Sequence, residues 1–129
     1  MVHAFSELDG LHVTVDKVAF MPHLDAPSER PYPFVYFITI HNDSEETVTI
    51  KGRKWVVTDA SGNTVVVEGD GVVGKFPRLK SGGNFSYNSY HTIGSDSEAE
   101  GAFIGVTDHG EPVLVRIPKF EMKAPTRNS

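Results

Sequence analysis

The residues best suited to binding chemistry lie in a glycine-rich segment near the middle of the chain. Three glycines and three basic side chains make up this candidate anion site: Gly69, Gly71, Gly74, Lys75, Arg78 and Lys80. Glycine-rich backbone can present several N–H groups to a phosphate, and basic side chains would neutralise its charge. Asp70 argues against this interpretation, because it adds a carboxylate to the same loop. The alternative is that the glycines serve positive-φ turns or close strand packing.

The spacing of these glycines also matches the G-x-G-x-x-G fingerprint of dinucleotide-binding proteins. That fingerprint requires a strand, a tight turn and a helix whose N-terminus faces the pyrophosphate. A strand is predicted before Gly69, but Pro77 and the residues before it disfavour a helix. The sequence therefore excludes a Rossmann site, and both interpretations of the loop stay open: phosphate binding without a helix, or glycines that serve turns and packing.

Arg53 and Trp55 share one face of a predicted strand, because they are two residues apart. Trp55 is the only tryptophan, and we predict that it anchors the core, since large aromatic side chains dominate sandwich cores. Arg53 joins the anion-binding candidates because guanidinium groups bind carboxylates and phosphates. It is also suited to stack on an aromatic ring or to pair with Asp59.

The other polar residues form no recognisable pattern of metal ligands or catalytic groups. The six histidines are scattered: His3, His12, His23, His41, His91 and His109. Cysteine is absent and no closely spaced histidine pair occurs, so only strand pairing, for example of His41 with His91, would assemble a metal site. No serine lies in a Gly-x-Ser-x-Gly elbow, and no carboxylate pair is set in an apolar segment. We therefore predict no catalytic residue, no metal site and no cofactor.

Charge and composition limit the class of protein. The chain has 12 basic and 17 acidic residues and a net charge of −5, which argues against general nucleic-acid binding. Residues 1–10 lack the features of a secretory signal, and no apolar run approaches the ~20 residues of a membrane-spanning helix. These features predict a cytoplasmic protein with neither nucleic-acid nor membrane partners.

The elements that position these residues are predicted to be β-strands. Val, Ile and Thr contribute 31 residues whereas Leu and Ala contribute 12, and β-branched side chains favour a pleated surface. Alternation and apolar runs between turn residues predict strands over residues 11–20, 34–42, 47–50, 53–58, 64–68, 85–91, 101–107 and 113–117, with a further edge at Phe120 and Met122. Predicted loops and tail cover residues 21–33, 69–83, 94–100 and 124–129.

These short strands, separated by turn residues, predict one antiparallel β-sandwich. Residues 34–42 are apolar on both faces, which indicates a central strand. Residues 32–34 are either an exposed aromatic lip or the start of that strand. The acidic segments 43–46 and 96–100 are predicted to be solvated loops, or else surfaces for a basic partner. We expect a single domain over residues 1–129, with its core within about 11–122.

Four stretches of the chain resemble the ApaG family. They are residues 36–42 (YFITIHN), 53–62 (RKWVVTDASG), 67–79 (VEGDGVVGKFPRL) and 85–89 (FSYNS), with further matches at 100–103 and 117–120. The chain departs from the family pattern at Ser97 and Ala99, where Gly and Met are usual. The resemblance implies a fibronectin type III-like or immunoglobulin-like sandwich, used as a partner-binding module in some eukaryotic F-box and polymerase-interacting proteins. It also implies a link to cobalt and magnesium homeostasis and a glycine motif read as a pyrophosphate-binding loop.

One function is expected, with two alternatives. We expect a non-catalytic cytoplasmic module that binds a protein partner through a sheet surface or loops. The first alternative is a binder of pyrophosphate or a nucleotide at residues 69–80, assisted by Arg53. The second is a divalent-metal-responsive protein. Monomer and homodimer both stay open, and the C-terminal edge is a candidate for pairing with a second copy.

Overall fold

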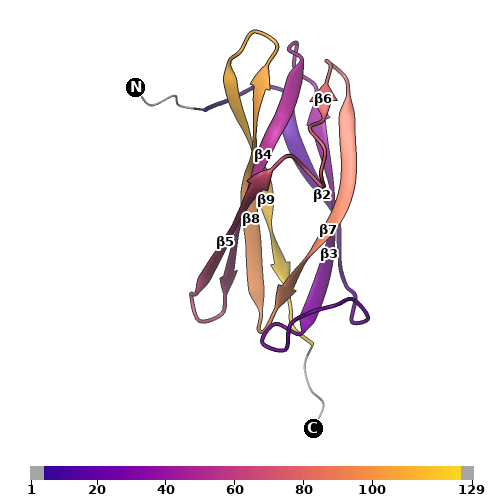
Figure 1. The fold of residues 1–129 in the computed structure, drawn as a ribbon, viewed down its shortest axis with the longest axis vertical. Coiled ribbons are helices and arrows are strands. Elements are labelled where there is room, and N and C mark those ends of the chain that lie inside the picture. Colours follow the sequence, from indigo (N-terminus) through magenta and orange to yellow (C-terminus); the bar gives the residue numbers. More distant parts are fainter. Residues whose placement is uncertain (1–4, 126–129) are drawn as a thin grey trace.

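Two β-sheets packed face to face form the protein (Figure 1). The structure, a computed structural model, describes residues 5–125, so His3 and the end of the predicted tail lie outside the described residues. The strands are β1 (Ser6–Glu7), β2 (Leu11–Phe20), β3 (Tyr32–Asn42), β4 (Val48–Asp59), β5 (Thr64–Asp70), β6 (Arg78–Leu79), β7 (Asn84–Ile93), β8 (Ser97–Thr107) and β9 (Pro112–Met122). No helix occurs among residues 5–125, and the predicted all-β sandwich is confirmed.

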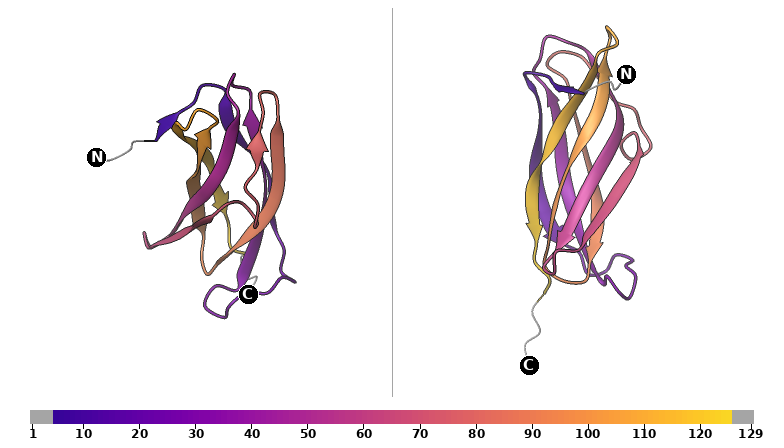
Figure 2. Two further views of the ribbon diagram at one scale, coloured as in Figure 1. Left: turned by 45° about the horizontal axis from the view of Figure 1, so that its top comes forward. Right: turned by 90° about the vertical axis from the view of Figure 1, so that its left-hand side faces the viewer.

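The larger sheet has the strand order β1-β9-β8-β4-β5, with β6 pairing the start of β4. The smaller sheet has the order β2-β3-β7. All strand pairs are antiparallel except the short β1–β9 pair. The two layers and their twist are visible in the turned views of Figure 2. Within the described chain there is accordingly no helix of the length and hydropathy that a membrane span requires.

The core lies between the sheets and confirms two predictions. Trp55 is only 1% exposed, as expected of a core anchor. The strand predicted over residues 34–42 is β3, which runs between β2 and β7 in the middle of the smaller sheet. Ile38 and Ile40 of β3 are fully buried, and Phe34 is 6% exposed, so residues 32–34 begin a covered strand and are not an exposed lip.

Two strands were predicted as broken but are continuous. Residues 47–50 and 53–58 are parts of β4, which passes Gly52 with a shift in its register to β8 between Ile50 and Gly52. A β-bulge of this kind absorbs an extra residue without ending the strand. In the same way β9 continues through Pro118 to Met122, and its register to β8 also shifts there.

The acidic segment predicted as a loop over residues 94–100 is mostly strand. β8 begins at Ser97, and Ser97 and Ala99 point into the core while Glu98 and Glu100 are exposed. This period of two was present in the sequence, but its inward positions are a serine and an alanine, which carry a weak apolar signal. The predicted loop over residues 69–83 likewise contains β6.

The edges of the sheets differ in how far they are covered. The C-terminal strand β9, expected to be a free edge, is joined at Val113 and Leu114 by β1. At the other end of the larger sheet, no strand among residues 5–125 pairs with the outer edge of β5. The β4–β5 hairpin stands at the margin of the molecule, at the lower left of Figure 1. β1 covers only the short part of β9 at Val113 and Leu114, whereas β5 has no outer partner over its whole length among residues 5–125, so β5 is the more open edge of the larger sheet.

Candidate functional site

Three amide groups of the glycine-rich loop after β5 are used in backbone hydrogen bonds of the protein itself. The N–H of Gly71 donates to the carbonyl of Lys51 over 2.8 Å, the N–H of Val72 donates to the carbonyl of Lys75 over 2.8 Å, and the N–H of Lys75 donates back to Val72 over 2.9 Å. An anion cradle needs such groups free and converging. In the structure these three amides close a tight turn and tie it to β4.

Local geometry explains the three glycines of the motif. Gly71 has φ +64°, and a Cβ there would lie 2.4 Å from the carbonyl oxygen of Lys75. Gly74 has φ +78°, a conformation that L side chains rarely adopt. Gly69 lies against the guanidinium of Arg53, and a Cβ added to Gly69 would lie 2.8 Å from that guanidinium. Turn geometry and close packing therefore account for the spacing, and anion binding at this loop stays a prediction.

Arg53 is the candidate site residue that the structure brings to the glycine loop. Its Nη1 donates to the carbonyls of Asp70 at 2.8 Å and Gly71 at 3.2 Å. The expected pairing with Asp59 is not made, because the β4–β5 register places Arg53 opposite Gly69, whose missing side chain leaves room for the guanidinium. Arg53 thus holds the end of β5 by its carbonyl oxygens.

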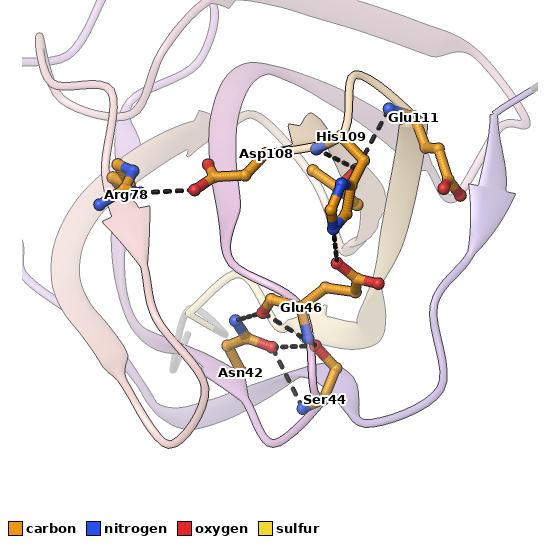
Figure 3. Close-up of polar contacts among 8 residues, drawn as sticks. Asn42, Ser44, Glu46, Arg78, Asp108, His109 and Glu111 are labelled. Atoms are coloured by element: carbon orange, nitrogen blue, oxygen red, sulfur yellow. Dashed lines mark hydrogen bonds and ion pairs between the residues drawn. The ribbon is translucent and has the colours of Figure 1, made fainter.

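The remaining basic candidates point elsewhere. Arg78 forms an ion pair with Asp108 in the β8–β9 turn, at 2.5 Å (Figure 3). Lys75 and Lys80 are exposed on the loop surface. Phe76 of the loop lies under a lysine of β4, with Lys51 Nζ 6.0 Å from the centroid of its ring.

Two of the histidines meet, but they are not the pair suggested from the sequence. His41 lies opposite Asn84 at one end of the β3–β7 pair and stacks on His12 with 4.7 Å between ring centroids. His91 lies opposite Phe34 near the other end, so the suggested pairing of His41 with His91 is wrong. Strand order brought His12 to His41 instead. Across residues 5–125, no three His, Asp or Glu side chains are grouped as metal ligands.

A groove runs between the free edges of the two sheets, β5 and β7, and sequence reasoning did not find it. Its volume is about 570 Å³. Val57, Val65 and Val67 line it from the larger sheet, and His91 and Ile93 line it from the smaller sheet. The groove thus lies where both sheets end, since β5 is the last strand of the larger sheet and β7 is the last strand of the smaller sheet.

The floor of this groove adjoins an aromatic cluster that contains unpaired polar atoms. The ring of Tyr36 lies 4.8 Å from the rings of both Trp55 and His91, and 6.3 Å from Tyr87. Trp55 Nε1, Tyr87 Oη and His91 Nε2 are buried without a hydrogen-bond partner among residues 5–125. Burial lowers the pKa of His91 to about 4 and raises the pKa of Tyr87. His91 is therefore neutral near pH 7.

The valines of β5 are the most exposed apolar strand residues in the sheet. Val65 and Val66 are each 53% exposed and Val67 is 40% exposed, although they alternate between the two faces. Both faces and the outer edge of this strand are therefore accessible. The sequence signal was the run of three valines, but a run of this kind equally describes a strand covered on both faces.

Comparison with known proteins gives consistent matches over most of the chain. A family model described as the ApaG domain matches residues 22–106. Protein ApaG of Vibrio cholerae is 37% identical over 100 residues, which cover 77% of this chain and 79% of that protein. Protein ApaG of Acidithiobacillus ferrooxidans is 35% identical over 108 residues, 83% of this chain and 85% of that protein.

Solved structures match the fold. The X-ray structure of structural genomics target SoR45 superposes with a TM-score of 0.81 at 30% identity, over 91% of this chain and 89% of that chain. A crystal structure from Bordetella pertussis, described as ApaA, has a TM-score of 0.80 at 29% identity, over 96% of this chain and 100% of that chain.

Proposed function

Since this chain belongs to the ApaG domain family, we propose that it is a non-catalytic cytoplasmic module that binds a protein partner through the open edge of β5. The observation that carries this proposal is the exposure of Val65, Val66 and Val67 on an edge strand whose outer side pairs with no strand among residues 5–125. An edge strand offers a row of N–H and C=O groups, and an extended segment adds to it by continuing the sheet.

The first half of β5 lacks the charged and proline residues that normally protect an edge. Proteins block free edges with charged or proline residues, or with a covering loop. Residues 64–67 of β5 are Thr-Val-Val-Val, without charge or proline. The first charge is Glu68, whose carboxylate lies 3.6 Å from Lys54 Nζ on the neighbouring strand. An apolar, uncharged edge beside a groove supports a recognition surface.

The groove adds selectivity to this surface. The register places Val65 opposite Val57 and Val67 opposite Trp55, so Val65 and Val67 share the inner face of the sheet. An added strand would direct alternate side chains to the same face, beside the groove wall formed by His91 and Ile93. Main-chain pairing would provide affinity, and the groove would select the side chains.

Affinity capture with matched variants tests the proposal. Val66→Lys places a charge on the open edge, and Ile104→Lys is the control, because Ile104 is 37% exposed on the interior strand β8. The ligands are peptides selected on the wild type from a random library, or proteins captured from lysate. We expect these ligands to bind Val66→Lys at least about tenfold more weakly than they bind the wild type. Equal binding by all three proteins would contradict recognition through β5.

A further inference from the structure

We propose that the partner of the β5 edge is a second copy of this chain, paired antiparallel about Val66 in a symmetric dimer. This inference rests on the proposed function insofar as β5 is the recognition strand. What points to a second copy is the order of residues along β5, which is complementary to itself in one register.

The two faces of β5 follow from its pairing with β4. Directly opposed residues of neighbouring strands point to the same face of a sheet. Val67 lies opposite the buried Trp55, so Val65 and Val67 belong to the inner face. Val66 belongs to the outer face, together with Thr64 and Glu68.

A two-fold axis perpendicular to the sheet pairs the two β5 edges into one continuous sheet. The inner faces of both copies then lie on the same side of that sheet. Opposed residues must then come from the same face, so the axis passes through a residue and not between two residues. Centred on Val66, the pairing sets Val66 against Val66, Val65 against Val67, and Thr64 against Glu68. All three valines of each copy face valines.

Neighbouring registers are less favourable. Centred on Val65, the axis would set Val67 against Asn63 and Val66 against Thr64. Centred on Val67, it would set Val66 against Glu68 and Val65 against Gly69. Each of these registers replaces valine–valine pairs by pairs of a valine with a polar residue or a glycine, and apolar cross-strand contact is lost.

Charges do not oppose the register centred on Val66. The two Glu68 residues would lie four residues apart along the joined strands, roughly 14 Å at ~3.4 Å per residue. This exceeds the ~8 Å Debye length at physiological salt. Each Glu68 also keeps its own Lys54 at 3.6 Å. Pairing therefore unites the apolar positions and keeps the carboxylates separate.

Cross-linking tests the register directly, because the chain contains no cysteine. Val66→Cys adds one thiol per chain, and opposed Cα atoms of antiparallel strands lie ~4.5–5.5 Å apart, within the range for a disulfide. We expect mild oxidation to convert Val66→Cys to a covalent dimer at least about tenfold faster than Ile104→Cys, whose thiol lies on an interior strand.

Two further variants distinguish this register from chance collision. Thr64→Cys and Glu68→Cys lie on the same exposed edge, but each faces the other residue in the dimer. We expect each variant alone to cross-link slowly and a mixture of the two to form the mixed dimer. Equal rates for Val66→Cys and Ile104→Cys, or no preference for the mixed pair, would overturn the proposal.

Sedimentation velocity separates this proposal from the general one. One strand pair is a small interface, and small interfaces belong to weak complexes, so we expect reversible self-association at about 10–100 µM that Val66→Lys abolishes and Ile104→Lys retains. A monomeric wild type over this range would overturn the dimer. If Val66→Lys still lowered the affinity for a captured partner, β5 would remain a recognition strand. Both proposals would fail if Val66→Lys changed neither self-association nor the affinity for a captured partner.

Discussion

At the scale of single residues, His91 is the titratable group whose surroundings alter it most. Its ring lies among Tyr36, Trp55 and Phe120, and its Nε2 has no hydrogen-bond partner in the part of the chain that the structure describes. Desolvation lowers the pKa of His91 from 6.5 to about 4. Between these pH values the unfolded chain binds a proton that the folded protein excludes, so stability rises with pH across this interval.

We expect the free energy of unfolding to fall as the pH drops from 6.5 to 4, by up to about 3 kcal/mol from His91 alone. His91→Phe should remove this part of the pH dependence, because phenylalanine does not titrate. Urea denaturation followed by Trp55 fluorescence at pH 7, 5.5 and 4.5 measures it. His23→Gln, at an exposed loop position, is the control and should keep the wild-type slope. An unchanged slope in His91→Phe would assign the effect to other groups.

Gly71 and Gly74 distinguish two reasons for glycine in a turn, which are a positive φ and a lack of space for a Cβ. Both have positive φ, but only Gly71 lacks space for a Cβ, which would meet Lys75 O at 2.4 Å. Gly74→Ala should therefore cost about 1–2 kcal/mol of stability from backbone strain alone. Gly71→Ala should cost distinctly more, because the turn must also open. Thermal unfolding of both variants measures the difference, and equal costs would refute the role of the Lys75 carbonyl.

At the scale of elements, the loop between β5 and β6 is where the anion-binding alternative is decided. The N–H groups of Gly71, Val72 and Lys75 are already bonded within the protein. We expect millimolar pyrophosphate to leave the amide resonances of residues 69–80 unchanged in NMR spectra. Separate titrations with Mg²⁺ and Co²⁺ test the metal-responsive alternative. Saturable shifts confined to this loop with pyrophosphate would establish an anion site there.

Asn42, the last residue of β3, connects this strand with the turn that follows it and with β6. Figure 3 shows its contacts in the turn. Its Nδ2 donates to the carbonyls of Glu46 and Leu79, both at 2.8 Å, and its Oδ1 accepts from the N–H of Ser44 at 3.1 Å. The side chain is fully buried, so each lost partner leaves a buried polar group unpaired. The turn after β3 and the short strand β6 therefore depend on this amide.

Asn42→Asp should destabilise the protein by about 2–4 kcal/mol, because a carboxylate cannot donate to the two carbonyls. Ser44→Ala should cost less, since it leaves both of those bonds in place. Chemical denaturation gives the two values, and hydrogen exchange should rise first at β6. A neutral Asn42→Asp would show that the turn is held by other contacts.

At the scale of the whole molecule, the larger sheet ends at β5, whose outer edge pairs with no strand among residues 5–125, beside a smaller sheet of three strands. Association along this edge would link folding to protein concentration, because a dimer interface stabilises only folded chains. We expect the Tm of the wild type to rise by a few degrees between about 5 and 500 µM, and the Tm of Val66→Lys to stay constant. Differential scanning fluorimetry over this range measures both, and parallel curves would count against association.

Much of the architecture was predictable because its signals are local. The strands over residues 11–20 and 34–42 followed from alternation and apolar runs, and Trp55 followed from its type and strand position. The errors were also local. Ser97 and Ala99 have small inward side chains, so the predicted strand begins at residue 101 although β8 begins at Ser97. The bulge at Gly52 was interpreted as a break in β4.

The sequence by itself determined the fold class, most strands and the family of this protein, since side-chain period and turn residues act over a few neighbouring positions. Only the tertiary structure decided which strand is the open edge, because an edge is defined by the strands that are absent beside it. The same holds for Arg53, which binds the Asp70 carbonyl, and for His91, which is buried against Tyr36 and Trp55. Their partners come from strands distant in sequence, and pairing and packing alone bring them together.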